Sequence, residues 1–399
     1  MSSNNRLQLI PLTIEKYAPP GNGLGFYRNK AVFVPRGVVG DELLVRIEKE
    51  KKRYIIGSLE KVIKPAPKRC QPLCRHYEEC GGCDLLQLSA ADQLNLKKEM
   101  LTEILAGVGI SGSLDMVAAP EVYAYRHRAV FHCDQEKNIG FLQRRSHRVV
   151  AVPDCMVLAP GLKKLLHKLV ENPELLPDGL TTCYALANRA GDFAAMGCRG
   201  RFRSGNLKSI KTIPDAIRED YGFGGIELAA AGFAQVNPQV VGLIIRDLVN
   251  HCVNLSTVAE IYGGSGTFSL PLAQVVKNLT VYESDAAAAA RGRSNAERNK
   301  LTNISFISGR AEKIVFTDHL DALVVDPPRV GLHAAVVDNI LRSPARKLVY
   351  ISCNPATLAR DLARLKDPVG NFSLTSIKAY DMYPGTTHLE VMAVLQRSR

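Results

Sequence analysis

TVAEIYGGSGTF, at residues 257–268, is an apolar, strand-like run that ends in a glycine-rich turn. Glycine has no side chain, so its backbone can form a tight turn and approach a ligand closely. A helix-like segment, FSLPLAQVV, follows the turn, and the free amide groups at the start of a helix favour polar or anionic ligand groups. The stretch therefore predicts a strand, a loop and a helix that together hold a nucleotide-like molecule.

The rest of the C-terminal half repeats this alternation of apolar runs and helix-like segments. Further apolar runs are LTVYES at 279–284, NISFI at 303–307, DALVVD at 321–326 and KLVYIS at 347–352. Strands that alternate with helices build a largely parallel sheet, in which the strands are buried on both faces. The last two runs, 373–380 and 389–396, are joined without a helix and should be antiparallel. We therefore predict a Rossmann-like α/β domain over residues 223–399.

The N-terminal residues 1–65 differ from this half in texture and in charge. Short β-rich runs such as LQLIPLTI and KAVFVP alternate with turn signals such as PPGNG at 19–23. Residues 1–69 carry 14 Lys or Arg against 6 Asp or Glu, in a chain whose formal net charge is +12. Such an excess favours a polyanionic partner. We predict a small, basic, OB-like β-barrel, which ends where Pro65 and Pro67 stiffen the chain.

The predicted middle domain, residues 66–222, combines a helix with a β-rich region. Ser89–Gly107 has a capped helical pattern, and Tyr123–Val152 alternates in the manner of antiparallel strands. The basic residues interleaved with apolar ones in this β-rich region are Arg126, His127, Arg128, Lys137, Arg144, Arg145 and Arg148. We place a basic hairpin here. The alternative is the solvated polar face of an ordinary sheet.

Three cysteines of the middle domain lie unusually close together, in the pattern Cys74-x5-Cys80-Gly-Gly-Cys83. Their spacing suits a metal, and the glycine pair lets the backbone wrap around it, but spacing alone leaves zinc and an iron-sulfur cluster both open. The chain has neither a recognisable signal peptide nor an apolar run of the ~18 residues that a membrane span needs. We therefore expect reduced thiols in a cytoplasmic protein with no membrane partner.

Two acidic residues stand at the ends of strand-like runs. Glu283 ends the run after the glycine turn, where a carboxylate can accept hydrogen bonds from two ribose hydroxyls. The turn lacks both G-x-G-x-x-G and G-K-[ST], which argues against a dinucleotide or a triphosphate. Asp326, in Asp326-Pro-Pro-Arg329, presents a carboxylate at the same edge of the sheet. The combination predicts a site for S-adenosylmethionine. The alternatives are a tight turn, a helix cap and a helix-initiating turn.

Cys353 follows the run KLVYIS and precedes Asn354-Pro355, which starts a helix. Its sulfur should lie at the carboxyl edge of the sheet, where a helix N-terminus and nearby cations can lower the ordinary thiol pKa of ~8.5. A thiolate there is a candidate nucleophile, and an inert packed cysteine is the alternative. Glu390 begins the last run and can reach the same edge as a proton acceptor. The alternative for Glu390 is an ordinary exposed carboxylate.

Four segments resemble the signature of the RNA uridine-5-methyltransferase family, particularly its iron-sulfur bacterial members that modify large-subunit ribosomal RNA. They are SCNPATLARDL at 352–362, DPPRVGL at 326–332, FAQVN at 233–237 and HLE at 388–390, and the resemblance spans nearly the whole chain. It implies that Cys353 is the nucleophile and Glu390 the base. It also implies that S-adenosylmethionine is contacted by Gln235, Tyr262, Glu283 and Asp326.

Two positions of the glycine turn depart from the family pattern. Gly263 stands where many relatives have Cys, and Thr267 where some have Asn. Neither change removes a required side chain.

The reaction of this family explains why a cysteine is needed. Carbon 5 of uracil is a poor nucleophile toward a sulfonium methyl group, so a thiolate first adds to carbon 6 and creates an enolate that is nucleophilic at carbon 5. A base must then remove the proton from carbon 5 so that the cysteine can leave. The target uridine must leave its stack to reach the sulfur. Phe233 and Tyr262 are candidate walls of the pocket that receives it.

The resemblance also suggests cofactors and partners. Cys155 matches the distant fourth ligand of the family, which implies a 4Fe-4S cluster held by Cys74, Cys80, Cys83 and Cys155. Zinc stays the alternative, and Cys70 could replace one ligand. The N-terminal barrel resembles the TRAM type of RNA-binding domain. We expect a monomer that acts on 23S rRNA, with the T-loop of tRNA as the alternative substrate.

Two rival functions remain at this point. Methylation of an amino group would need no cysteine, and an aromatic residue after Asp-Pro-Pro is typical of it, whereas Arg329 stands here. A non-catalytic RNA-binding or assembly factor could keep the same cofactor fold.

Overall fold

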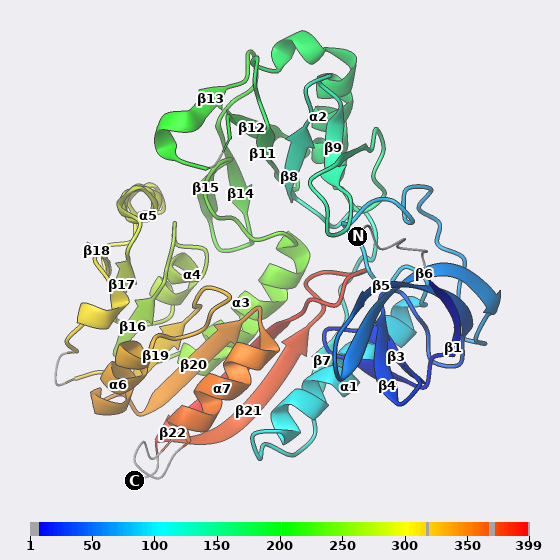
Figure 1. Cartoon of the computed structure of the whole chain (residues 1–399). Coiled ribbons are helices and arrows are strands. Elements are labelled where there is room, and N and C mark those ends of the chain that lie inside the picture. The colour runs from blue at the N-terminus through cyan, green and yellow to red at the C-terminus, as the bar shows by residue number, and fades with distance from the viewer. Residues whose placement is uncertain (1–7, 201, 317–318, 367–371, 398–399) are drawn as a thin grey trace. The chain divides into compact units, whose positions relative to one another are not determined.

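The computed structural model describes residues 8–200, 202–316, 319–366 and 372–397, which fall into two compact units (Figure 1). The first unit runs to Glu103 and includes the short segment Pro384–Thr387. The second unit holds Ile104–Tyr383 and the chain from His388 onward. Among the described residues, no helix is both long and apolar enough to cross a membrane. The three domains expected from the sequence, with boundaries at residues 65 and 222, stay a prediction.

The first unit is built on a curled six-stranded sheet. Its strands are β1 (Leu9–Thr13), β2 (Lys16–Ala18), β3 (Asn22–Tyr27), β4 (Lys30–Val34), β5 (Glu42–Glu50) and β6 (Tyr54–Lys64), in the order β1-β5-β6-β4-β3-β2. Only β4 and β6 pair in parallel. Alternate residues point inward, so that Ile10 and Leu12 of β1 pack on Val32 and Val45. This sheet is the β-rich segment that the sequence predicts, and its assignment as a TRAM-type barrel stays a prediction.

The cysteine-bearing segment of the first unit packs against helix α1 (Ala90–Ala106). Leu85 and Leu88 of the segment share a small core with Leu96 of the helix. The helix starts as predicted, because the hydroxyl of Ser89 accepts a hydrogen bond from the amide of Asp92 at 3.1 Å. The loop of the cysteines is held by Arg36, whose guanidinium donates hydrogen bonds to the carbonyls of Cys80 at 2.9 Å and Cys83 at 3.2 Å.

The second unit contains a six-stranded antiparallel sheet. Its strands are β8 (Arg128–Cys133), β9 (Ile139–Leu142), β10 (Val149–Ala151), β11 (Thr182–Ala187), β12 (Phe193–Cys198) and β13 (Leu207–Ser209), in the order β10-β9-β8-β11-β12-β13. Helix α2 (Pro160–Glu171) covers one face with four buried leucines, Leu162, Leu165, Leu166 and Leu169. The antiparallel strands that the sequence predicts within 123–152 are confirmed as β8, β9 and β10.

An eight-stranded sheet forms the other part of the second unit, reached through the hairpin of β14 (Ala216–Asp220) and β15 (Gly225–Ala229). Its strands are β7 (Asp115–Val117), β16 (Thr257–Ile261), β17 (Asn278–Glu283), β18 (Ile304–Ser308), β19 (Ala322–Val325), β20 (Lys347–Ser352), β21 (Phe372–Tyr380) and β22 (Glu390–Arg397). The order is β18-β17-β16-β19-β20-β22-β21-β7. Strands β16 to β20 are parallel, while β22 is antiparallel to both neighbours, as the sequence predicts.

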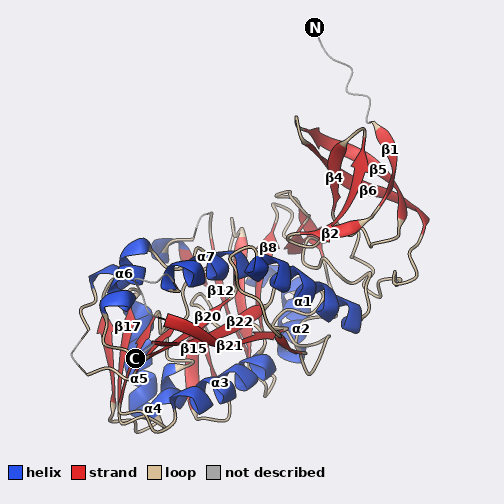
Figure 2. Cartoon of the chain, turned by 90° about the horizontal axis from the view of Figure 1, so that it is seen from below, coloured by secondary structure: helices blue, strands red, loops and turns tan. Residues whose placement is uncertain are grey.

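Helices cover both faces of this sheet, which is why its strands are continuous apolar runs. They are α3 (Pro238–Cys252), α4 (Ser269–Ala273), α5 (Ala286–Arg298), α6 (Ala334–Arg342) and α7 (Pro355–Leu365). Figure 2 shows α6 and α7 on one face and α3 and α4 on the other. The predicted Rossmann-like α/β domain is thus confirmed.

Candidate active site

Five predicted site residues lie at one edge of the eight-stranded sheet. Each stands where a strand meets that edge: Tyr262 after β16, Glu283 at the end of β17, Asp326 after β19, Cys353 after β20 and Glu390 at the start of β22. Strand β22 runs opposite to β20, and Ser352 pairs with Val391. The start of β22 therefore meets the end of β20, and Glu390 comes beside Cys353.

The glycine turn is fixed by hydrogen bonds to strand β17. The amides of Tyr262 and Gly263 donate to the carbonyl of Tyr282, at 2.9 and 3.3 Å. Tyr262 has a φ of 69°, a left-handed conformation that is uncommon for a residue with a side chain and often marks a functional site. A Cβ atom on Gly263 would come within 2.2 Å of Val281. In this packing the residue is therefore glycine for lack of space, whatever stands there in relatives.

The carboxylate of Glu283 links the glycine turn to strand β17 and can still accept another hydrogen bond. One carboxylate oxygen accepts from the amide of Gly264 at 2.9 Å, and the other from the amide of Asp285 at 2.7 Å. The oxygen that accepts from Asp285 also accepts from the hydroxyl of Ser284 at 3.3 Å. A carboxylate has about four acceptor positions, so the oxygen bonded to Gly264 can still accept a further hydrogen bond. The geometry suits the predicted ribose contact, which stays a prediction.

Glu260 is a site residue that the sequence reading missed. It lies within β16 and is 1% exposed, and no described residue has hydrogen-bond geometry with either carboxylate oxygen. Its carboxyl lies beneath the turn, because a Cβ on Gly263 would be 3.5 Å from it. Burial raises the pKa of Glu260 to about 8, against the lowering effect of the neighbouring hydroxyl of Ser269, and the negative charges of Asp326 and Glu283 add to the rise. An acidic residue inside an apolar strand was the available signal.

The two carboxylates beside Cys353 also hold their protons more tightly than usual. Burial raises the pKa of Glu390 well above its ordinary value, and the charge of Asp326 raises it further. Burial likewise raises the pKa of Asp326. Two adjacent buried carboxyl groups cannot both ionise easily, so this pair can retain or accept a proton near neutral pH.

The thiol of Cys353 differs from the sequence expectation. Burial and the negative charges of Glu390 and Asp326 raise its pKa to about 11, against the lowering effect of Arg329. We expected a lowered pKa from the helix N-terminus and nearby cations. That expectation was wrong because burial, which is the largest effect, and the carboxylates at the same edge outweigh the single arginine. In this state the sulfur is a neutral thiol.

Arg329 is held at the edge by helix α7 and by His388. Its carbonyl accepts hydrogen bonds from Asn354 at 2.8 Å and from the hydroxyl of Thr357 at 3.2 Å. Its guanidinium lies 3.1 Å from Nδ1 of His388. Because the guanidinium can only donate, this nitrogen of His388 is an acceptor. Arg329 is thus fixed close enough to Cys353 to act on its charge.

Tyr383 adds an aromatic wall to the site. Burial raises the pKa of its hydroxyl, with further contributions from the charges of Glu390 and Cys353. Its ring packs edge-on against His388, with centroids 5.9 Å apart. Tyr383 was not predicted, since an isolated tyrosine in a loop gives no pattern.

Gln235 and Phe233 lie away from the strand ends, on the segment between β15 and α3. Gln235 is buried and Phe233 is 68% exposed. Among the described residues, no hydrogen bond joins Gln235 to the other five predicted residues. The roles expected for Gln235 and Phe233 therefore stay predictions.

The ten cysteines differ in burial, and only Cys70 is exposed. Cys74, Cys80 and Cys83 are half-buried on one loop of the first unit, whereas Cys155 belongs to the second unit. The amide of Gly82 donates to the sulfur of Cys80 at 3.4 Å. Within the described ranges, no three His, Cys, Asp or Glu side chains are grouped to hold a metal ion. The donor set suits an iron-sulfur cluster or zinc, and the cluster stays a prediction.

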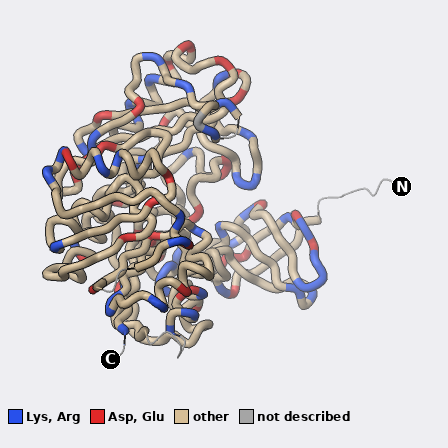
Figure 3. Tube along the Cα trace, turned by 90° about the vertical axis from the view of Figure 1, so that its left-hand side faces the viewer, with Lys and Arg blue, Asp and Glu red and all other residues tan. Residues whose placement is uncertain are grey.

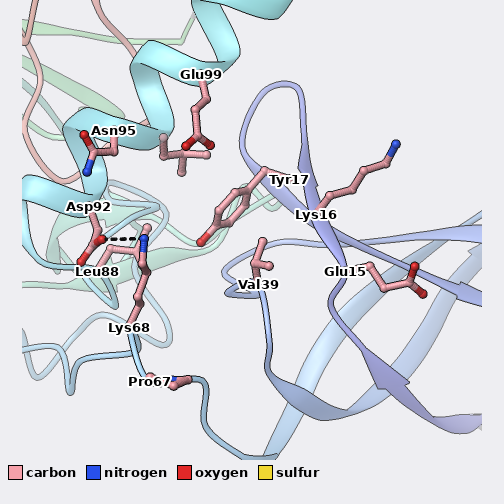
Figure 4. A pocket seen from close by; sticks show the side chains of 11 residues that line it. Glu15, Lys16, Tyr17, Val39, Pro67, Lys68, Leu88, Asp92, Asn95 and Glu99 are labelled. Carbon is pink, nitrogen blue, oxygen red and sulfur yellow. Dashed lines mark ion pairs between the residues drawn. The ribbon is translucent and has the colours of Figure 1, made fainter.

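A separate pocket of about 510 Å³ lies within the first unit (Figure 4). Tyr17 projects into it, and Lys68 and Asp92 form an ion pair at 3.3 Å on its wall. Its lining mixes carboxylates with ammonium groups and holds none of the predicted site residues. The pocket therefore does not compete with the sheet edge as the candidate active site.

Comparison with known proteins agrees with this geometry. Residues 227–398 match the family model described as tRNA (Uracil-5-)-methyltransferase. The 23S rRNA (uracil(1939)-C(5))-methyltransferase RlmD of Vibrio parahaemolyticus is 29% identical, over 99% of this chain and 97% of its own length. An uncharacterized RNA methyltransferase of Thermosynechococcus vestitus is 28% identical, over 98% of both chains.

A solved structure shares the fold. Pyrococcus abyssi tRNA (uracil-54, C5)-methyltransferase, in complex with S-adenosyl-L-homocysteine, superposes with a TM-score of 0.78 over 97% of this chain and 100% of its own, at 24% identity. That likeness establishes a class I methyltransferase fold. The family model over residues 227–398 and the full-length relatives support the RNA uridine-5-methyltransferase family for this chain.

Proposed function

We propose that this protein transfers a methyl group from S-adenosylmethionine to carbon 5 of a uridine in RNA, with Cys353 as nucleophile and Glu390 as base. The observation that carries the proposal is the meeting of β20 and β22, which brings Cys353 and Glu390 together beside the glycine turn. A thiol and a buried carboxyl at one sheet edge match the two roles that the reaction requires. Amino-group methylation would use neither.

Cys353 and Glu390 act in successive steps of the proposed reaction. The sulfur of Cys353 bonds to carbon 6, and the electron pair displaced from the ring double bond makes carbon 5 nucleophilic. S-adenosylmethionine supplies the methyl group as a sulfonium. Glu390 then accepts the proton of carbon 5, the bond between sulfur and carbon 6 breaks, and the double bond is restored.

The raised pKa of Cys353, about 11, adds one requirement to this scheme. A neutral thiol must lose its proton as it attacks, so a carboxylate beside it has to accept that proton. Asp326 and Glu390 both lie close enough to act on the thiol's charge. We assign the thiol proton to Asp326 and the carbon 5 proton to Glu390, and Arg329 stabilises the thiolate as it forms.

The cofactor site is proposed at the glycine turn. Tyr262 and Gln235 would contact the cofactor, Glu283 would accept hydrogen bonds from its ribose, and Asp326 would lie between cofactor and uracil. The carboxyl of Glu260 under the turn favours a positively charged ligand when it is ionised. This charge suits the sulfonium donor better than its neutral thioether product.

RNA is proposed to bind along the whole chain. The hairpin between β5 and β6 carries Lys49, Lys51, Lys52 and Arg53, and Figure 3 shows Lys and Arg gathered at the tip of a hairpin in the first unit. Such contacts grip the phosphate backbone and weaken as salt rises. The full-length relatives named as 23S rRNA enzymes favour that substrate. The tRNA enzyme of similar fold makes the tRNA T-loop the second candidate.

A 4Fe-4S cluster on Cys74, Cys80, Cys83 and Cys155 is the proposed metal centre. Support comes from the chemistry of the donors: four thiols suit such a cluster, all four are half-buried, and Gly82 lies directly beside the sulfur of Cys80. Iron and sulfide analysis of protein purified without oxygen tests it, and one tightly bound zinc ion with no iron would refute it.

The central test is covalent trapping. RNA that contains 5-fluorouridine cannot release a proton from carbon 5, so enzyme, RNA and methyl donor should form a stable adduct that survives denaturing electrophoresis. Methylation of ordinary RNA without any such adduct would refute the mechanism. Mass spectrometry of 5-methyluridine in separate rRNA and tRNA fractions, with and without the gene, decides between the two substrates.

A further inference from the structure

One face of the six-stranded sheet in the second unit is only partly covered. Helix α2 buries Ala129 and Phe131 on the other face. The alternate residues of these strands point to the other face of the sheet. Two of them, Val130 of β8 and Tyr184 of β11, are directly paired and only half-buried. The part of this face around Tyr184 is therefore accessible to solvent.

An aromatic side chain lies exposed at this place. Phe202 is 53% exposed, and its ring meets the ring of Tyr184 edge-on, with centroids 5.2 Å apart and planes at 78°. Edge-to-face packing holds a ring in a defined orientation and leaves one of its faces free. A large exposed phenylalanine fixed in this way suits a flat aromatic ligand.

The surrounding charge points to a polyanion. Between Phe193 and Pro214 the sequence has five Lys or Arg, at 199, 201, 203, 208 and 211, and no Asp or Glu. Arg199, Arg203 and Lys208 are exposed, but Lys208 pairs through Gly197 with Cys183 and so points to the opposite face, which α2 covers. Arg201 lies outside the described residues. Surfaces that bind proteins more often carry charges of both signs. A run of basic residues without acidic ones, beside an exposed aromatic ring, is typical of sites for single-stranded nucleic acid.

The same face leads toward the candidate active site. Arg128 lies on it, two residues from Val130, and donates a hydrogen bond to the carbonyl of Gly232 at 2.6 Å. Both Tyr184 and Tyr383 are close enough to act on the charge of Arg128. Tyr383 in turn is close enough to Cys353 for their charges to interact. A strand that crosses this face can therefore continue to the nucleophile.

The geometry points to a stacking site for an unpaired base of the RNA substrate on Phe202, a few nucleotides from the target uridine. Phe202 and Tyr184 supply the aromatic platform, and Arg203, which follows Phe202 in the chain and is exposed, contacts a neighbouring phosphate. This inference rests on the proposed function. It adds a surface that selects RNA with an unstacked base beside the methylated one.

The test compares Phe202→Ala, Phe202→Trp and Val253→Ala in the full-length holoenzyme. Loss of one stacked base weakens single-stranded binding about 5- to 100-fold, so Phe202→Ala should raise KM for the RNA by that factor. Its kcat, its affinity for S-adenosylmethionine and its melting temperature should change little. Phe202→Trp should retain the wild-type KM. Val253→Ala removes a comparably exposed apolar side chain, which is 47% exposed, and should leave KM unchanged.

The outcomes separate this inference from the proposed function. An active enzyme whose KM is the same with Phe202→Ala as with wild type overturns the stacking site and leaves the methyltransferase intact. The same holds if Phe202→Ala changes only association with another protein. A wild-type enzyme that methylates no RNA overturns the proposed function itself.

The phosphate contact has its own readout. Arg203→Ala should reduce the slope of log affinity against log salt by about one unit. Lys208→Ala, which removes a charge on the opposite face of the sheet, serves as the control and should leave the slope unchanged. A wild-type slope in Arg203→Ala would overturn the phosphate contact at that residue.

Discussion

Cys353 and the trio of Cys74, Cys80 and Cys83 show two ways in which a chain positions a thiol. Cys353 directly follows β20, and the pairing of β20 with β22 fixes its neighbour Glu390. The trio lies on a loop without helix or strand, and within the described residues it forms no group that could hold a metal. A backbone ladder positions a catalytic thiol before any ligand arrives. Ligand thiols on a loop reach their final geometry with the group they bind.

The largest effect should come from removing the thiol that the sheet positions. Cys353→Ala leaves no atom to bond to carbon 6, so kcat should fall by at least about 10³-fold. Binding of S-adenosylmethionine should be unchanged, because Cys353 lies on a different strand from the glycine turn. Methyl transfer and calorimetric titration measure the two quantities. Cys70→Ala, which removes an exposed thiol, is the matched control.

If Cys353→Ala kept more than a tenth of the wild-type kcat, the proposed role of Cys353 as the nucleophile would be wrong. Amino-group methylation or another mechanism without a nucleophile would then have to be considered.

A somewhat smaller effect is expected at Glu390. Removal of a general base typically costs about 10²- to 10⁴-fold in rate. Glu390→Gln keeps the size of the side chain but cannot accept the carbon 5 proton, so the methylated RNA should stay bonded to Cys353. Denaturing electrophoresis with ordinary RNA should show this complex for the variant and not for the wild type. Fast turnover without an adduct would assign the base elsewhere.

In contrast to Cys353, the loop thiols Cys74, Cys80 and Cys83 should affect the stability of the protein more than the rate of the reaction. Cys80→Ser should reduce bound iron and lower the melting temperature, because bound metal stabilises the fold that holds it. The kcat for methylation of RNA should fall less in Cys80→Ser than in Cys353→Ala. Iron content, thermal melting and activity are the measurements. Unchanged iron content in Cys80→Ser would exclude this residue as a ligand, and the same measurement on Cys70→Ser shows whether Cys70 serves instead.

The regular parts of the fold were predictable from the sequence. Apolar runs such as KLVYIS indicate buried strands, and two final runs without a helix between them indicate the antiparallel pair β21 and β22. These patterns follow from local periodicity, which the sheet preserves. The same patterns placed Cys353, Asp326 and Glu390 at one edge.

Other features depend on contacts that no local pattern records. Strand β7 has three residues, Asp115–Val117, which is too short for a periodic signal, and its pairing with β21 joins segments far apart in the chain. The direction of the pKa shift of Cys353 depends first on its burial and then on the carboxylates that meet at the edge. Glu260 looked like part of a strand, and only its burial without a hydrogen-bond partner among the described residues marks it.

The smallest predicted effect concerns Glu260. The preference of the site for S-adenosylmethionine over S-adenosylhomocysteine should depend on pH. The pKa of Glu260 is about 8 in the folded protein, against about 4.3 in an unfolded chain. Between these values the folded state binds more protons than the unfolded state, so this group makes the free energy of unfolding fall as pH rises from about 4.3 to about 8. Above about pH 8 the side chain is a buried anion beneath the glycine turn.

A positively charged ligand at that turn should offset the cost of this anion. The affinity ratio of S-adenosylmethionine to S-adenosylhomocysteine should therefore rise about tenfold or more between pH 6.5 and pH 9, as expected for one charge pair within about 12 Å at an effective dielectric constant near 20. Calorimetric titration of both ligands at each pH measures the ratio. Glu260→Gln removes the ionisation and should flatten the profile. An equal rise in Glu260→Gln would show that another group at the edge, such as Asp326, carries the charge that distinguishes donor from product.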